Sequence, residues 1–113
     1  MLFRSTHDQF FPWLSISSSG VVGVTWLDRR NDPANISYQP FAAVSTDGGA
    51  SFGNNFNLYK SNKKLSNPNN DGMNGFFMGD YTGNAWANSM LYTSWMDSLN
   101  GQRMQDEVGG LLE

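Results

Sequence analysis

The sequence predicts an all-β fold, and three observations lead to that prediction. Aromatic residues make up 14% of the 113 residues and include four Trp, which supplies apolar surface for a core and excludes a disordered chain. Short runs of β-branched and aromatic residues recur along the chain, as is typical of strands. Residues that favour turns, among them 12 Gly, separate these runs.

The first half of the chain predicts a four-stranded antiparallel meander. The run Val21–Asp28 is the clearest strand, because it is rich in Val, Thr and Trp. Asp47-Gly48-Gly49 predicts a hairpin turn, since Gly adopts positive φ without a steric penalty. The expected strands are Phe11–Ser17, Val21–Asp28, Ser37–Ser45 and Ser51–Tyr59.

The second half predicts a shorter set of strands. Residues 60–75 are a polar linker loop, and residues 98–110 are polar with no clear strand pattern. Between them, Phe77–Ala85 and Met90–Asp97 are the expected strands, with a turn at Asn88-Ser89. The chain is therefore divided into a unit at 9–59, a linker at 60–75 and a second, partial unit at 76–113.

The two units repeat. Phe10-Phe11 corresponds to Phe76-Phe77 at an offset of 66, and Trp26-Leu27-Asp28 corresponds to Trp95-Met96-Asp97 at an offset of 69. A meander of about 50 residues with a linker has the size of one β-propeller blade.

Composition and charge exclude several classes of function. Seven Lys and Arg against ten Asp and Glu argue against a nucleic-acid partner. The absence of Cys excludes disulfides and thiolate zinc sites. No apolar run approaches the roughly 20 residues of a membrane span, and no glycine-rich phosphate loop or other cofactor motif occurs. Both ends look abrupt and carry no signal peptide, so we expect a piece of a longer chain.

The segment Ser45-Thr46-Asp47-Gly48-Gly49-Ala50-Ser51-Phe52 fits the pattern Ser-x-Asp-x-Gly-x-Ser/Thr-Phe/Trp. It resembles the Asp-box, or bacterial neuraminidase repeat, of sialidase-like β-propellers. We expect Asp47 to accept backbone N–H groups, Gly49 to take positive φ, and Phe52 to pack inward. The hydroxyls of Ser45 and Ser51 are expected to tie the strand ends. The alternative is an ordinary Asp-Gly-Gly hairpin.

The resemblance extends over about residues 9 to 98, because Phe-Phe-Pro-Trp, Val-Thr-Trp-Leu-Asp-Arg-Arg and Phe-Phe-Met-Gly-Asp-Tyr flank the motif in the family's order. It implies an incomplete propeller of about six blades, of which this chain supplies about two. It further implies a secreted or cell-surface protein that acts on or binds a glycan or glycoprotein. Expected partners are the remaining blades of a longer chain or further copies of this one. The alternative function is a non-catalytic scaffold for protein interaction.

Candidate catalytic residues follow from the same resemblance. Asp80 is a candidate general acid and Tyr81 a candidate nucleophile of glycoside hydrolase chemistry, although Asp80 would equally suit a buried structural role. The family's Arg-Ile/Leu-Pro motif is absent, and the only Glu residues are Glu107 and Glu113. We therefore expect no complete catalytic site within this chain.

Candidate ligand-binding residues are Arg29, Arg30 and Trp86. An Arg can bind a carboxylate or a sugar hydroxyl, but neighbouring strand residues face opposite ways, so the other Arg is expected to pair with Asp28 or Asp32. A structural ion pair is the favoured alternative for both. Trp86, beside a turn, is the Trp expected to be exposed for sugar stacking, whereas Trp26 and Trp95 recur with the repeat and are expected in the core.

A metal site is not expected. Residues 67–72, Asn-Pro-Asn-Asn-Asp-Gly, resemble the start of a calcium loop. The twelfth position is Met78 rather than a bidentate Glu, so a polar loop is favoured. His7 is the only histidine, and one His cannot form a His cluster.

Overall fold

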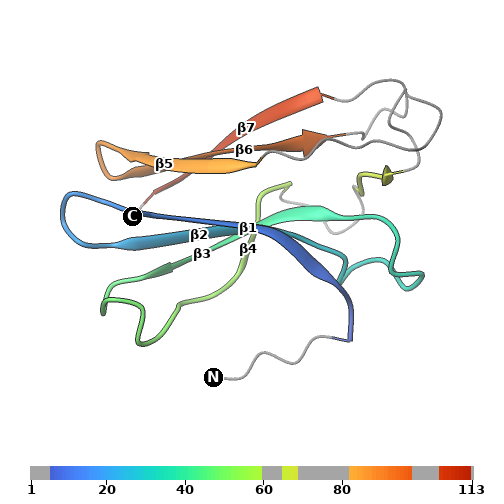
Figure 1. Ribbon diagram of the computed structural model, residues 1–113, viewed down its shortest axis with the longest axis horizontal. Coiled ribbons are helices and arrows are strands. Elements are labelled where there is room, and N and C mark those ends of the chain that lie inside the picture. The colour runs from blue at the N-terminus through green and yellow to red at the C-terminus, as the bar shows by residue number, and fades with distance from the viewer. Residues whose placement is uncertain (1–5, 60–64, 69–81, 98–104, 113) are drawn as a thin grey trace.

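The chain forms two antiparallel β-sheets, shown in Figure 1. This computed structural model describes residues 6–59, 65–68, 82–97 and 105–112. The first sheet has the strand order β1-β2-β3-β4, and the second has the order β5-β6-β7. The described residues contain no α-helix, so the all-β prediction is confirmed for this part of the chain. Neither sheet closes on itself.

The strands are short and follow one another along the chain. Their bounds are β1 Gln9–Ile16, β2 Val22–Asp28, β3 Gln39–Ser45, β4 Phe56–Asn57, β5 Gly83–Ala87, β6 Met90–Asp97 and β7 Gln105–Leu112. The sequence predicted β1, β2, β3 and β6 to within two residues at each end. β7 lies where the sequence showed no clear strand pattern.

The prediction of a long fourth strand was wrong. Strand pairing in β4 is limited to Phe56–Asn57, whereas Ser51–Tyr59 was expected. The backbone N–H of Ser51 donates to the carboxylate of Asp47 at 2.9 Å, and Gly53 donates to the carbonyl of Val44 at 3.0 Å. The chain after the turn is thus bonded to the turn and, at one position, to β3, and the regular β3–β4 ladder begins only at Phe56.

The turn between β5 and β6 is confirmed at Asn88-Ser89. Both residues have positive φ, 50° and 62°, as a two-residue hairpin loop of the primed type requires. β5 spans Gly83–Ala87, so it runs two residues beyond the predicted end at Ala85. The predicted start of this strand, from Phe77 through residue 81, lies outside the described residues, as do most of the linker at 60–75 and the repeat anchor Phe76-Phe77.

Hydrogen bonds join β1 to β5 at a constant offset along the chain. Thr82 Oγ1 donates to the carbonyl of Phe11 at 3.2 Å, Asn84 Nδ2 donates to the carbonyl of Trp13 at 2.9 Å, and Trp86 Nε1 bonds to Ser15. Each pair is 71 residues apart. The two strands therefore run in the same direction, and their first residues lie at the same end of the molecule.

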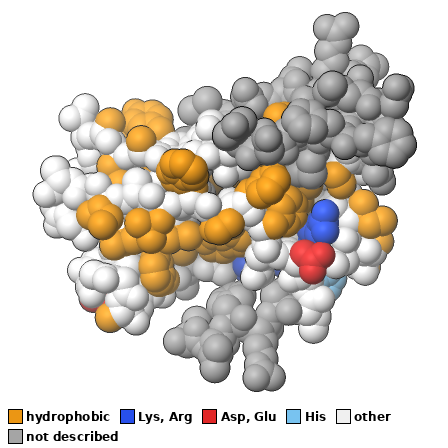
Figure 2. Space-filling model, in the orientation of Figure 1, with side chains coloured by type: hydrophobic (Ala, Val, Ile, Leu, Met, Phe, Trp, Pro, Cys, Tyr) orange, Lys and Arg blue, Asp and Glu red, His pale blue; other side chains and the backbone are white. Residues whose placement is uncertain are grey.

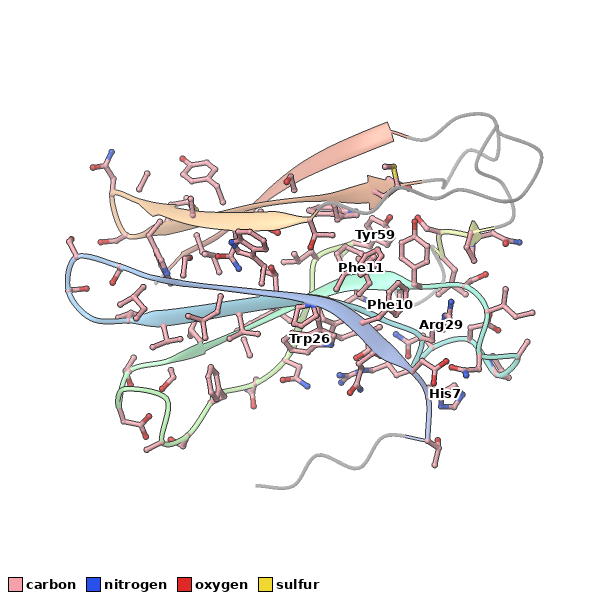
Figure 3. All side chains as sticks on the ribbon, viewed as in Figure 1. His7, Phe10, Phe11, Trp26, Arg29 and Tyr59 are labelled. Atoms are coloured by element: carbon pink, nitrogen blue, oxygen red, sulfur yellow. The ribbon has the colours of Figure 1, made fainter. Side chains whose placement is uncertain are left out.

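The core lies between the two sheets. Leu27, Tyr38 and Trp95 form its buried centre, with exposed fractions of at most 5%. Phe11 and Tyr59 pack against this centre, and Figure 3 places them between the sheets. The Tyr38 hydroxyl donates to the carbonyl of Met96 at 2.8 Å. Side chains from both sheets thus share one core, which fixes the second sheet on the first.

Candidate functional site

The Asp47 turn between β3 and β4 has the hydrogen bonds that the sequence motif predicts. Ser45 Oγ donates to Asp47 Oδ1 at 2.7 Å and Ser51 Oγ to Asp47 Oδ2 at 2.5 Å. Gly49 N–H donates to Ser45 Oγ at 2.9 Å, and Gly49 has a φ of 90°. Both hydroxyls thus bond to Asp47, and Ser45 is the last residue of β3, but Ser51 lies before β4 rather than at a strand end.

The carboxylate of Asp47 is held in its charged form by these donors. The side chain and backbone of Ser51, followed by the hydroxyl of Ser45, lower its pKa from the usual 3.8 to about 2. The side chain is exposed to solvent, and every partner named above lies within four residues of it. This geometry makes Asp47 a structural residue of the turn.

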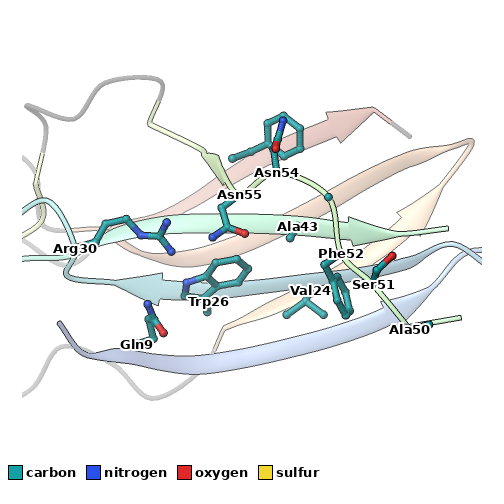
Figure 4. Close-up of a pocket in the computed structure, with 13 residues that line it drawn as sticks. Gln9, Val24, Trp26, Arg30, Ala43, Ala50, Ser51, Phe52, Asn54 and Asn55 are labelled. Carbon is teal, nitrogen blue, oxygen red and sulfur yellow. The ribbon is translucent and has the colours of Figure 1, made fainter. Parts of the chain in front are cut away.

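Phe52 does not pack inward as predicted. Its side chain is 42% exposed, because the loop after Ser51 leaves the sheet before the strand pairing of β4 begins. The ring instead lines an open pocket of about 1160 Å³ on the face of the first sheet that points away from the second. Figure 4 shows Phe52 beside Val24 and Trp26 in this pocket.

Trp26 forms the floor of the pocket rather than part of the core. Its ring stacks on Phe41 at a centroid distance of 6.1 Å, and its Nε1 donates to Asp28 Oδ2 at 2.8 Å. It is only half-buried, so the prediction of a core position is wrong for Trp26. Trp95 is 5% exposed and does lie in the core. The difference arises because the second sheet covers only one face of the first.

Arg30 pairs with Asp28, as one of the sequence alternatives proposed. Arg30 Nη2 lies 2.6 Å from Asp28 Oδ2, and the guanidinium stands 4.3 Å over the ring of Phe41. Burial raises the pKa of Asp28, but the hydrogen bonds from Arg30 and Trp26 outweigh it and leave the pKa below its usual value. Arg30 also lines the pocket, where its charge is compensated by Asp28.

Arg29 and Arg30 have different partners, although strand alternation does not extend to them, because β2 ends at Asp28. Its Nη1 lies 3.0 Å from Asp8 Oδ2, and its guanidinium stands 4.8 Å over the ring of Phe10. Asp8 is 60% exposed in its side chain and also accepts from Asn35 Nδ2 at 3.1 Å. An exposed ion pair of this kind contributes about 0–1 kcal/mol.

The prediction that Trp86 is the exposed Trp is wrong. Trp86 is half-buried between the sheets, where its Nε1 donates to the carbonyl of Ser15 at 3.3 Å. Trp13 is the exposed one, at 51%. The turn beside Trp86 suggested exposure, but the stacking of the second sheet on the first buries this residue.

A polar cluster that the sequence did not predict joins the two sheets. Ser66 Oγ donates to Asp97 Oδ1 at 2.8 Å and lies 2.7 Å from the hydroxyl of Tyr59. Trp95 Nε1 donates to the same hydroxyl at 3.2 Å, and burial raises the pKa of Tyr59. In the sequence, only the repeated Trp-x-Asp pattern pointed to this cluster. The pattern indicated Trp95 and Asp97, but it did not indicate Tyr59 and Ser66, which bond to them.

The candidate catalytic pair Asp80 and Tyr81 lies outside the described residues. Thr82, the next residue, lies beside Phe11 at the end where β1 and β5 begin. No group of His, Asp and Glu suited to a metal occurs in the described part of the chain. The described residues likewise include no helix long and apolar enough to cross a membrane. Comparisons with protein-family models, curated proteins and solved structures give no match.

Proposed function

We propose that this chain is part of a sialidase-like β-propeller that binds or acts on glycans, and that it supplies blades rather than a complete catalytic site. The observation that carries this proposal is the closed hydrogen-bond pattern of the Asp47 turn between β3 and β4. The hairpins β1–β2 and β5–β6 also support it, because β1 and β5 lie next to each other and run in the same direction, as equivalent strands of neighbouring blades would.

The glycan-binding role is assigned to the end of the molecule where β1 and β5 begin. Arg29 lies there, beside the first residues of β1, because its backbone N–H donates to the carbonyl of Asp8. Its guanidinium is the group suited to the carboxylate of an acidic sugar. Asp8 holds that group through an exposed pair and would compete with the ligand.

A binding assay with matched variants tests this assignment. The protein is applied to immobilised sialylated glycans and to their neutral counterparts. Arg29→Gln is expected to weaken binding to the sialylated glycans at least tenfold, and Asp8→Asn is expected to strengthen it. Thr46→Ala, an exposed substitution in the Asp47 turn, is the control and leaves binding unchanged. Absence of binding to every glycan, together with no hydrolysis of a fluorogenic sialoside, overturns the proposal.

A second function, a non-catalytic protein scaffold, is favoured by the ion pairs of both arginines. Arg29 is paired with Asp8 and Arg30 with Asp28. If the pairs are purely structural, glycan binding is absent and Asp8→Asn lowers stability without creating affinity for acidic sugars.

A further inference from the structure

The second sheet covers one face of the first sheet, and residues 49–56 line a pocket over part of the other face. Gly23 lies against Leu91 of the second sheet, and Leu27 packs in the shared core. Because strand residues alternate, Val24 and Trp26 point the other way, where they line the pocket of Figure 4. Figure 3 shows Trp26 on that opposite side.

This second face is apolar, and its most exposed part lies over β1. Leu14 is opposite Val24 in the β1–β2 ladder, and Ile16 is opposite Val22, so both share its side of the sheet. Leu14 is 55% exposed and Ile16 is 62% exposed. Figure 2 shows hydrophobic side chains gathered over β1. We name Leu14, Ile16, Val24 and Trp26 the open face.

The sequence repeat shows which face of the second sheet is equivalent to the open face of the first. Trp26 in β2 matches Trp95 in β6 at an offset of 69, but Trp26 points away from the other sheet whereas Trp95 points toward it. The two sheets therefore contact each other through non-equivalent faces: the face with Trp95 in the second sheet meets the face opposite Trp26 in the first. The open face is the counterpart of the β5–β6 face that the first sheet covers.

The equivalent face of β5–β6 shows which contacts form when a face of this kind packs against another sheet. In the same register, Leu14 takes the place of Asn84 and Ile16 the place of Trp86. Asn84 and Trp86 both donate hydrogen bonds to carbonyls of β1. The open face carries aliphatic side chains at these two positions, so it lacks the side-chain donors that Asn84 and Trp86 provide.

The other end of the stack presents a complementary surface. Ala85, Ala87, Tyr92 and Ser94 are exposed on the side of β5–β6 that points away from the first sheet, and we name them the outer face. Tyr92 and Ala85 occupy the positions that Gly23 and Ser15 use for stacking in the first sheet. One molecule thus carries both halves of a stacking contact at opposite ends.

We propose that the open face binds the outer face of a second copy of this chain. The contact would continue the stacking interface that already exists between the two sheets, with Tyr92 at the position of Gly23. Tyr92 would meet Val22 and Ile16, which are smaller than the Leu91 and Trp86 that Gly23 meets. Such a head-to-tail contact joins different surfaces, so it forms rings where the rotation closes and filaments where it does not. The proposal does not depend on glycan binding.

Sedimentation velocity of the full chain over a hundredfold concentration range tests the proposal, with three variants. Leu14→Lys/Ile16→Lys changes the open face and Tyr92→Lys changes the outer face; each is expected to weaken self-association at least tenfold. Trp13→Lys is the matched control, because Trp13 is similarly exposed on β1 but lies opposite Thr25, on the other side of the sheet. Ile16→Thr provides a milder change should the Lys variant fold poorly.

Mixing the two interface variants distinguishes the occupants of the open face. Each variant retains one intact half of the contact, so a mixture is expected to form heterodimers and nothing larger. A wild-type monomer at every concentration overturns the proposal. Association that Leu14→Lys/Ile16→Lys abolishes and Tyr92→Lys leaves unchanged also overturns it, since the open face would then pair with itself.

Discussion

The hydroxyl of Ser66 donates a hydrogen bond to the carboxylate of Asp97 at 2.8 Å. Ser66 forms a β-bridge with Tyr38, and Asp97 is the last residue of β6. Both residues are buried, with exposed fractions of 0% and 3%. The same hydroxyl lies 2.7 Å from that of Tyr59. A charged group buried at the junction of two sheets needs such donors, because an unsatisfied one is costly.

Ser66→Ala is therefore expected to destabilise the protein by about 1–3 kcal/mol, since Asp97 loses a donor that water cannot easily replace. Urea denaturation followed by Trp fluorescence measures the effect. Ser94→Ala is the control, because Ser94 is exposed on β6. Equal midpoints for the two variants would show that the bond contributes nothing to stability.

Gly23→Ala is expected to cost about 1–3 kcal/mol through overpacking. A Cβ at this position would lie 2.8 Å from Leu91 Cδ2 and 3.1 Å from Trp86 Cζ2. In a Leu91→Ala background the same substitution is expected to cost markedly less, because the clashing methyl groups are gone. A double-mutant cycle by urea denaturation measures the coupling, and additive effects would contradict the close sheet contact.

Gly49→Ala is expected to destabilise the Asp47 turn by roughly 1–2 kcal/mol, because an L-residue resists the left-handed region in which Gly49 has a φ of 90°. Gly53→Ala is the control. Its Cβ would meet only the Val44 carbonyl at 3.7 Å, an ordinary contact. Thermal unfolding by circular dichroism should show a lower Tm for the Gly49 variant alone.

Asp47 is expected to contribute a stability that acid removes. Its pKa in the folded protein is about 2, below the usual 3.8, so the folded state favours the carboxylate. The contribution is complete above pH 3.8 and is lost as the pH falls toward 2. The Tm difference between wild type and Asp47→Asn should therefore be largest near neutral pH and shrink in that window. A pH-independent difference would contradict this role.

The sequence predicted the features that depend on near neighbours. β2, β6, the Asn88-Ser89 turn and the bonds around Asp47 each follow from residues within a few positions of one another. The half-burial of Trp86 did not follow, because it depends on the stacking of the second sheet on β1. That contact joins residues 71 apart, and no local pattern encodes it.

The bonds of the Asp47 turn span at most four residues, whereas the bonds named above between the sheets span 31 to 71 residues. Closing a short loop costs little chain entropy, and contacts distant in sequence slow folding. We therefore expect the β3–β4 turn and the β5–β6 hairpin to form within microseconds and the docking of the two sheets to limit the folding rate. Substitutions at Gly23 or Asn84 should then slow folding, while Gly49→Ala mainly alters the stability of an early local structure.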